Sequence, residues 1–431
     1  MGLEAIRKFI LRQLMDIQLG GAMALRYKLV LLMRLFKRAL FLILILPVFG
    51  LPLIVIRVMR PWLLVRFGEL ESSGIGHFSL PVEIFLCEVE CGLHNPGKKF
   101  VDIWFLQSTV CNGVLLKIWG RILTIWPRGI AKPISLLNQL IPGGKIHRIP
   151  YRHITDQRIP WQFCDIHNVL KLASPHITFS REEEAQGFAG LKAMGIQNND
   201  SFICFIARDK AFYSDEHSRS HQRNSSVHTI AQAMNDLTVK GYKAIRMGVK
   251  VTERLRTTNP SIIDYSNSGM RTELLDLFLI SRCRFMVSTA TGLDGLASTF
   301  RHPVVYVNLV DFGHADLWGS DSIFIPKRFW SIAEKRFLTF AEIFGLGAHL
   351  FGTTWQYKRE GIEWVDNDVD EIRAVMVEME QRLLGSWVSH PEDEFLQNRF
   401  RSLWPVRRAG LGMLQSRIGA EFLRRNRALL Q

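Results

Sequence analysis

The stretch from Phe202 to Val310 constrains the fold of this chain more than any other part of the sequence, because apolar runs alternate there with amphipathic segments. The apolar runs predict four β-strands, at Phe202–Ala207, Tyr242–Met247, Phe285–Ser288 and Val304–Val307. Helical patterns lie between the strands or follow them, at 229–239, 271–282 and 293–300. Strands that alternate with helices form a parallel sheet with helices on its faces. We therefore expect a doubly wound α/β domain here.

Polar residues follow nearly every one of these strands. In strand order they are Arg208-Asp209, Gly248, the run from Ser288 to Gly292, and Asn308. In an open α/β sheet, ligands bind beyond the carboxyl ends of the strands, where helix N-termini present backbone N–H groups to anions. This half of the chain therefore predicts a site for a phosphorylated ligand, which we interpret as a nucleotide-sugar.

Two arginines and one turn of small residues are the candidates for binding the nucleotide-sugar. Arg208 and Arg246 each stand at a strand end, where an arginine can hold a diphosphate through two parallel hydrogen bonds. The turn offers four candidates whose hydroxyl and backbone donors suit a phosphate: Ser288, Thr289, Thr291 and Gly292. Asp264 follows another short apolar run and is a candidate for the nucleoside pocket. A salt bridge between Arg208 and Asp209 and an ordinary helix cap at 288–292 are the structural alternatives.

A second glycine-bearing loop lies between an apolar run at 62–67 and a helical pattern at Phe78–Glu90. Strand, glycine loop and helix open a nucleotide-type α/β domain, although a lone GxG sequence is also typical of a tight turn without a ligand. His77 ends this loop, and a histidine with its ordinary pKa of about 6.5 can deprotonate an acceptor hydroxyl. A purely structural His77 is the alternative. The long polar loop at 212–226, with His217, His221 and Arg223, is a candidate lid or a solvated surface loop.

The N-terminal residues are basic and apolar. Residues 1–66 carry eleven Lys and Arg against two acidic residues, in a chain of net charge +14. Ala39–Ile56 contains no charge and is interrupted by Pro47, Gly50 and Pro52. Basic residues flank it on both sides, so the positive-inside rule defines no outer side.

We expect this segment to be a monotopic or re-entrant hairpin that breaks at 47–52, behind a basic amphipathic helix over residues 3–38. It would lie on the anionic cytoplasmic face of the inner membrane. A single membrane span and a buried core hairpin are the alternatives. The sequence contains no recognisable nucleic-acid module.

The six cysteines form no CxxC pair and indicate free thiols in a reducing compartment. Cys87 and Cys91 are spaced to share a helix face, but no histidine lies near enough in the sequence to complete a metal set. No DxD-type motif stands at a strand end either. We therefore expect no metal and no cofactor, with the nucleotide-sugar as a substrate.

Five segments together resemble a family of bacterial surface-polysaccharide glycosyltransferases. They are RFGELESSGIGHFSLPVEIFL (66–86), ARDKAFY (207–213), GYKAIRMG (241–248), the run from Ile262 to Asn308, and DSIFIPKRFW (321–330). The resemblance covers residues 63–431 and is most specific over 200–330. It implies a GT-B architecture, with two facing Rossmann-like domains and a donor held mainly by the C-terminal one. More distantly, Arg-Asp after a strand and the STxxG turn are similar to motifs of protein O-fucosyltransferases.

The resemblance also implies roles for the candidate residues. Arg208 would hold the donor diphosphate, with Ser288, Thr289, Thr291 and Gly292 beneath it. Gly74, Gly76 and His77 would line the acceptor side. The chain departs from the family at Lys210, where serine is usual, and at 222–224, where Gln-Arg-Asn stands for Tyr-Arg-Asp. The lost carboxylate puts an acid or base role there in doubt.

Four domains are expected from these patterns. They are a membrane-associating segment (1–60), an N-terminal Rossmann-like domain (61–178), a donor domain (179–345), and C-terminal helices that pack back on the N-terminal domain (346–431). After Pro326 the pattern is mainly helical and ends in a basic amphipathic helix at 415–430. The expected activity is sugar transfer from a nucleotide diphosphate sugar to a lipid-linked or polysaccharide acceptor. Another polysaccharide-modifying transferase, such as a pyruvyltransferase, and a non-catalytic membrane scaffold are the alternatives.

Overall fold

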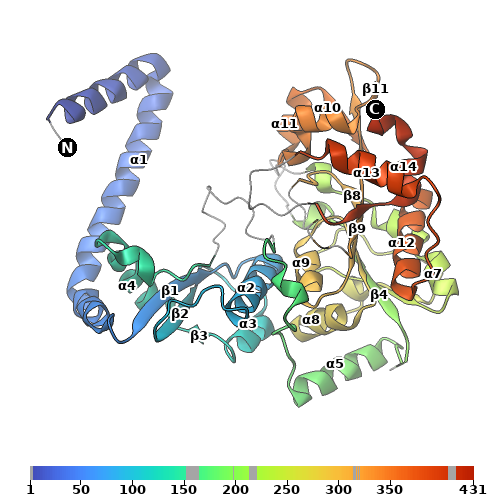
Figure 1. Ribbon diagram of the computed structural model, residues 1–431, viewed down its shortest axis with the longest axis horizontal. Helices are drawn as coiled ribbons and strands as arrows, with labels where there is room; N and C mark the ends of the chain where they lie inside the picture. The colour runs from blue at the N-terminus through green and yellow to red at the C-terminus, as the bar shows by residue number, and fades with distance from the viewer. Residues whose placement is uncertain are drawn as a thin grey trace. The chain divides into compact units, whose positions relative to one another are not determined.

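The computed structural model describes residues 3–151, 165–197, 199–212, 221–313, 317, 319, 321–405 and 414–431. Its contacts divide the chain into two compact units (Figure 1). The N-terminal unit comprises Met1–Glu69, Pro96–Phe105 and Thr124–Ile149, and the main unit comprises Leu70–Asn95, Leu106–Leu123 and Pro150–Gln431. The four domains expected from the sequence, and two Rossmann-like domains that face each other, stay predictions.

A long helix and a small sheet make up the N-terminal unit. Its elements are α1 (Leu3–Met59), β1 (Leu64–Leu70), β2 (Phe100–Leu106), β3 (Thr124–Ile125), α4 (Arg128–Leu140) and the 3₁₀ turn η1 (Gly144–His147). The sheet has the order β1-β2-β3, and β2 pairs with β3 in parallel. Ile45, Leu53 and Leu137 pack α1 against α4. Arg57 donates to Asn138 Oδ1 at 2.9 Å and so fixes the end of α1.

Helix α1 continues through Pro47 and Pro52, so the expected hairpin at 47–52 is wrong. Proline already has a helical φ and removes one hydrogen-bond donor, which kinks a helix more readily than it reverses the chain. The non-helical backbone lies at Gly21, where φ is 56°. Leu42–Met59 is long and apolar enough to cross a membrane, with a mean hydropathy of 2.6, which is weak evidence for membrane association.

A seven-stranded sheet forms the centre of the main unit. Its strands are β4 (Phe202–Ile206), β5 (Lys243–Arg246), β6 (Ile262–Ile263), β7 (Met286–Ser288), β8 (Val304–Leu309), β9 (Ile323–Pro326) and β13 (Arg417–Ile418). Their spatial order is β13-β9-β8-β7-β4-β5-β6, and every neighbouring pair is parallel. If the strands are numbered along the chain with β4 as strand 1 and β9 as strand 6, their order across the sheet from β6 to β9 is 3-2-1-4-5-6. This is the strand order of a dinucleotide-binding sheet. The parallel α/β domain expected over 202–310 is therefore confirmed.

Helices cover both faces of this sheet (Figure 1). One group is α5 (Arg181–Ala193), α8 (Glu273–Arg282) and α9 (Gly292–Thr299); the other is α6 (Val227–Ala233), α7 (Asn235–Val239) and α12 (Val369–Leu384). Helix α5 begins with a capping box at Ser180, because the side chains of Ser180 and Glu183 each accept the other's backbone N–H. Gly187 and Gly190 let α5 approach Phe278 and Leu275 of α8 closely.

Further helices and 3₁₀ turns belong to the main unit. They are α2 (Ile75–Glu90), α3 (Gly113–Trp119), α10 (Phe340–Gly345), α11 (Thr354–Arg359), α13 (Asp393–Leu403), and the 3₁₀ turns η2 (Val169–Lys171), η3 (Lys210–Phe212), η4 (His221–Arg223), η5 (Tyr265–Asn267) and η6 (Ala348–Leu350). Helix α2 packs along α9 within the main unit and begins at Ile75, so Gly76 and His77 lie in its first turn and not in the loop before it.

The residues after Pro326 are less helical than expected. β10 (Arg328–Ser331) pairs antiparallel with β11 (Arg336–Phe337) and β12 (Ile362–Val365) in a separate sheet. The helix expected at 415–430 is wrong, because residues 417–418 form β13 beside β9, and α14 (Ala420–Arg425) and η7 (Arg427–Leu430) follow. Ile418 is buried in this pairing, and such tertiary burial outweighs local helix preference. The expected packing of residues 346–431 on the N-terminal domain stays a prediction.

Candidate functional site

The order of the parallel strands identifies where a ligand would bind. The order reverses between β4 and β7, and doubly wound sheets bind ligands beyond the carboxyl ends of the strands at such a point. Arg208 follows β4, and the turn from Ser288 to Gly292 follows β7. The Thr289 hydroxyl accepts a hydrogen bond from the Arg208 backbone N–H at 2.9 Å, which ties the two strand ends together. The structure thus brings these predicted residues to one edge.

The side chains of the 288–292 turn hold the turn itself. Ser288 Oγ lies 3.4 Å from both Thr291 Oγ1 and Asp294 Oδ1, and Thr291 Oγ1 donates to Asp294 Oδ1 at 3.2 Å. Thr291 also caps α9 by accepting from the Leu293 N–H. Ala290 has a left-handed φ of 59°, an uncommon conformation for a residue with a side chain. The hydroxyls therefore set the shape of the turn, and they accept hydrogen bonds from two of the local backbone N–H groups, those of Thr291 and Leu293.

The two predicted glycine loops adjoin each other at the start of two helices. A Cβ on Gly76 would lie 2.8 Å from the carbonyl oxygen of Gly292, and a Cβ on Gly292 would lie 3.2 Å from the backbone N of Gly76. Further along, a Cβ on Gly295 would lie 3.6 Å from Leu80 Cβ. Gly76 meets Gly292, and the later residue Leu80 meets the later residue Gly295, so α2 and α9 run parallel. Both positive helix ends therefore lie side by side.

The start of α2 is the helix end of this pair that suits an anion. Gly74, the N-cap residue of α2, makes no side-chain cap, and the first turn of α2 contains no acidic residue. The backbone N–H groups of a first helical turn have no partner within the helix. The first turn of α9 differs, because Thr291 caps its Leu293 N–H and the Asp294 carboxylate lies within it. The N–H groups at the start of α2, beside the strand end of Arg208 and Thr289, are therefore the donors that suit a diphosphate here.

His77 lies in the first turn of α2, beside these helix ends. Burial lowers the pKa of its imidazole, and the nearby Glu71 carboxylate opposes this effect. The ring is therefore mostly neutral near pH 7, which is the form that accepts a proton. A Cβ on Gly74 would lie 3.0 Å from His77 Cδ2, so the glycine leaves room for the ring.

Arg246 and Asp264 occupy a different position from the 288–292 turn. The guanidinium of Arg246 is buried, donates to the Glu253 carbonyl at 2.6 Å, and lies 3.3 Å from Asp264 Oδ2. Asp264 also accepts from the Leu255 N–H at 2.8 Å. Among the contacts of the described residues, neither charged group reaches the turn. Both groups stabilise the loop after β5, and their predicted ligand-binding roles stay predictions.

Asp209 binds backbone groups of two loops. One carboxylate oxygen accepts from the Ala211 N–H at 2.9 Å, and the other accepts from the Thr252 N–H at 2.6 Å. Asp209 therefore fixes the loop after β4 against the loop after β5.

The segment 221–225, part of the polar loop given as a candidate lid or a surface loop, crosses the same edge of the sheet. Ser225 N–H donates to the Arg208 carbonyl at 3.0 Å. Arg223 donates to the Ala290 carbonyl and lies 3.7 Å from Asp311. The segment thus contacts residues that follow β4, β7 and β8. Of the polar loop proposed as a lid, His217 lies outside the described residues.

Lys327 is a residue that the sequence analysis did not select as a site candidate. It directly follows β9, is fully buried, and donates to the Asn224 carbonyl at 2.8 Å. Burial lowers the pKa of this amine, and Asp366, 2.8 Å away, opposes the shift. The rule that selected Arg208, a cation at the end of an apolar strand, also applies to Lys327.

We expect Asp294→Asn to change how stability depends on pH. Burial raises the pKa of the Asp294 carboxyl from 3.8 to about 6. The folded state therefore holds this proton more tightly than the unfolded state, and the resulting stability is lost as pH rises from about 4 through about 6. The loss should be about 3 kcal/mol at 1.36 kcal/mol per pKa unit. The asparagine avoids it, so unfolding titrations should show the variant gaining about this much over the parent protein between pH 4 and 7. A difference that stays constant with pH would contradict this.

No family model and no curated protein matches the chain. Several solved structures are similar to it. A glycosyl transferase of family 9 from Veillonella parvula DSM 2008 has 14% identity and a TM-score of 0.33, over 56% of this chain and 80% of that one. The E. coli ADP-heptose LPS heptosyltransferase II has 12% identity and a TM-score of 0.33, over 56% and 84%. A UDP-N-acetylglucosamine 2-epimerase has 10% identity and a TM-score of 0.29, over 76% and 98%. The similarity is remote, so the functional argument depends on the chain's own residues.

Proposed function

We propose that this chain is a glycosyltransferase that moves a sugar from a nucleotide diphosphate sugar to a lipid-linked or polysaccharide acceptor. The observation that carries the proposal is the contact between the N-termini of α2 and α9 at the switch point of the sheet. A diphosphate is the leaving group of such a donor, and it gains negative charge as the sugar departs. Two helix ends and the Arg208 guanidinium stabilise that charge without a rearrangement of the protein.

The proposed reaction assigns a role to each loop. The bond between the sugar carbon and the diphosphate oxygen breaks, and the acceptor oxygen forms the new bond to that carbon. His77 takes the proton of the acceptor hydroxyl, which its neutral imidazole can do. Since the cationic groups of the protein neutralise the leaving diphosphate, the proposed transfer step uses no catalytic metal.

A membrane location fits a lipid-linked acceptor. Several side chains in the second half of α1 are apolar and exposed, among them Ile43, Leu44, Val48, Leu51 and Ile54. Exposed apolar residues along a helix are unfavourable in water and favourable in lipid. Basic residues stand on both sides of this band, and anionic headgroups attract them. We propose that α1 holds the enzyme on the cytoplasmic face of the inner membrane, as a monotopic or single-span anchor.

Nucleotide binding tests the proposed function directly. We expect a nucleoside diphosphate or its sugar to raise the free energy of unfolding of the detergent-purified protein by about 2.7 kcal/mol at 100 times Kd. The Arg208→Ala variant should lose this gain, because the guanidinium binds the diphosphate. Thermal unfolding with a panel of nucleotides measures the stabilisation of the parent protein and of the Arg208→Ala variant.

The exposed Arg256 provides a matched control, and Arg256→Ala should retain the gain. No stabilisation by any nucleotide would contradict the transferase and favour a non-catalytic scaffold. Transfer that disappears with EDTA and returns with Mn²⁺ would contradict the metal-independent step.

A further inference from the structure

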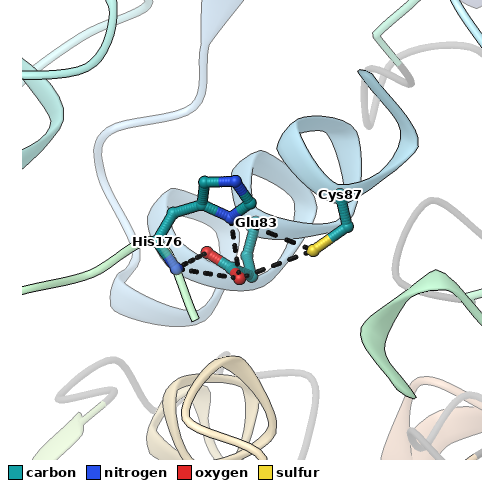
Figure 2. Close-up of side chains that lie close together, drawn as sticks. All are labelled: Glu83, Cys87 and His176. Carbon is teal, nitrogen blue, oxygen red and sulfur yellow. Dashed lines mark hydrogen bonds and ion pairs between the residues drawn. The ribbon is translucent and has the colours of Figure 1, made fainter. Parts of the chain in front are cut away.

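The side chains of Glu83, Cys87 and His176 lie together beside the second half of α2, and each is of a type that binds metal ions (Figure 2). His176 Nδ1 lies 3.2 Å from Glu83 Oε1 and 3.9 Å from Cys87 Sγ, and that sulfur lies 3.6 Å from the same carboxylate oxygen. The expectation of no metal stays untested, but the reason given for it does not hold, since a histidine does lie beside Cys87 in the structure. Sequence distance concealed it, because His176 follows Cys87 by 89 residues and tertiary structure brings them together.

The spacing of these donors matches a zinc site. Zinc binds sulfur at about 2.3 Å and nitrogen or oxygen at about 2.0–2.1 Å, usually in a tetrahedron. These lengths place two ligands of a tetrahedral zinc about 3.3–3.6 Å apart. The three observed separations, 3.2, 3.6 and 3.9 Å, describe one face of such a tetrahedron with little adjustment. Thiolate, imidazole and carboxylate are also the ligand types that zinc accepts together.

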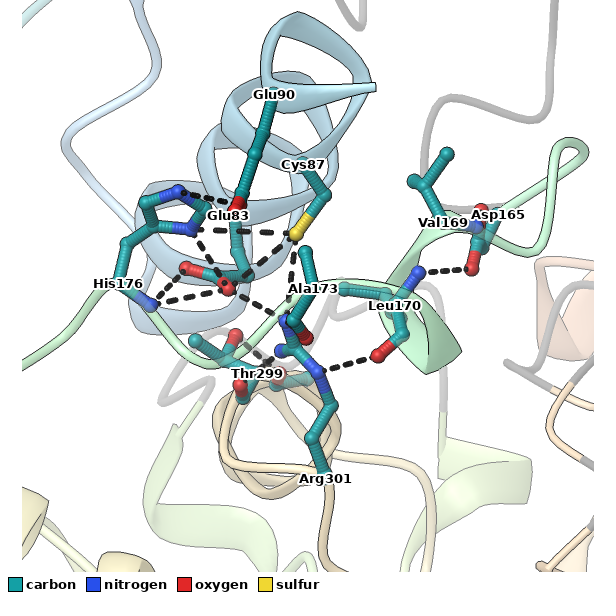
Figure 3. A network of polar contacts seen from close by, with 11 residues as sticks. Glu83, Cys87, Glu90, Asp165, Val169, Leu170, Ala173, His176, Thr299 and Arg301 are labelled. Atoms are coloured by element: carbon teal, nitrogen blue, oxygen red, sulfur yellow. Dashed lines mark hydrogen bonds and ion pairs between the residues drawn. The ribbon is translucent and has the colours of Figure 1, made fainter.

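The surroundings of the cluster resemble an outer shell of a metal site (Figure 3). Glu90 Oε2 lies 3.6 Å from His176 Nε2, so a carboxylate orients the ring from its other nitrogen. Arg301 lies 2.8 Å from Glu83 Oε1 and 3.3 Å from Cys87 Sγ, and it also donates to the Leu170 carbonyl. The guanidinium fixes the orientation of both donors. It also shares Glu83 with any bound cation, which lowers the affinity for that cation.

Charge balance allows the metal beside this arginine. A thiolate and a carboxylate neutralise Zn²⁺, so the bound ion and its two anionic ligands carry no net charge beside Arg301. Zinc binds cysteine as a thiolate, so formation of the zinc–sulfur bond releases the thiol proton to solvent.

We propose that Glu83, Cys87 and His176 bind one Zn²⁺, with a water molecule in the fourth position. The site lies seven residues along α2 from Gly76, which is about 10 Å at the helical rise of 1.5 Å per residue. It is therefore separate from the paired helix ends, and it joins α2 to the 172–178 segment. The zinc site does not depend on the proposed transferase function.

Metal binding to the full-length detergent-purified protein tests this site. Equilibrium dialysis against Zn²⁺, followed by elemental analysis, should give one equivalent per chain. Dialysis against Co²⁺ should give the charge-transfer absorption of a cobalt–thiolate bond. Cys87→Ser and His176→Gln should each weaken Zn²⁺ binding by about 100-fold or more, since loss of an outer-shell partner alone costs 10–100-fold.

Cys91 offers a matched control, because it is exposed and stands one helical turn after Cys87. The Cys91→Ser variant should bind Zn²⁺ and Co²⁺ as the parent protein does. No bound zinc in the parent protein would overturn the proposal, whatever the variants do. Equal binding by the Cys87→Ser and Cys91→Ser variants would also overturn it. Neither result would bear on nucleotide binding.

Discussion

Replacing Gly76 by alanine should lower nucleotide-sugar affinity and the transfer rate by about 100-fold, the usual effect of a misplacement of about 1 Å at a site. The new methyl group would lie 2.8 Å from the backbone oxygen of Gly292, and a backbone atom cannot turn aside as a flexible side chain can. The start of α2 must therefore move away from the start of α9. The two helix ends would then no longer act on the same diphosphate. Overpacking of this kind also costs about 1–3 kcal/mol of stability.

Gly345 provides the control for this substitution. It ends helix α10, and a Cβ there would meet no atom within 4 Å. Gly345→Ala should leave nucleotide binding unchanged and should stabilise the protein by up to about 1 kcal/mol, since alanine favours helix more than glycine does. Nucleotide titrations and thermal unfolding of both variants measure the two effects. Unchanged nucleotide affinity in Gly76→Ala would refute the role of the paired helix ends.

Replacing Arg301 by methionine should destabilise the main unit by about 3–5 kcal/mol, because it leaves the Glu83 carboxylate buried without its cation. Glu83 is fully buried, and Arg301 Nη2 lies 2.8 Å from it. The guanidinium also donates to the carbonyls of Leu170, Ala173 and Thr299, which would lose these bonds. Arg301 itself has a left-handed φ of 66°, a conformation that these contacts hold in place.

Arg425 is the matched control, since it pairs with Glu421 on the exposed side of α14. Arg425→Met should cost only about 0.3–0.5 kcal/mol, as exposed helix pairs do. Denaturant unfolding in the presence of EDTA compares the two variants without a contribution from bound metal. Similar losses of unfolding free energy in Arg301→Met and Arg425→Met would show that the Glu83–Arg301 pair contributes no more to stability than a surface pair.

The strand ends of the candidate site were predictable from the sequence for a simple reason. Buried parallel strands are short apolar runs, and their carboxyl ends share one edge of the sheet. Arg208 and the turn at Ser288–Gly292 follow two such runs, so the local pattern predicts that both lie at the same edge, and the strand order then makes them neighbours. The cap of α5 at Ser180 was predictable as well, because both partners lie within four residues. Lys327 obeys the same strand-end rule and could have been included.

Contacts between distant segments were decided only by the tertiary structure. Periodicity predicts which face of α2 is buried, but not that α9 covers it, so Gly76 and Gly292 were assigned to different loops of the site. The Glu83–Arg301 pair joins residues 218 positions apart, and Cys87 meets His176 across 89. Residues 417–418 became a strand because β9 offered an unpaired edge beside them. Local sequence encodes the period of an element and its ends, whereas its partners depend on strand order and packing across the whole chain.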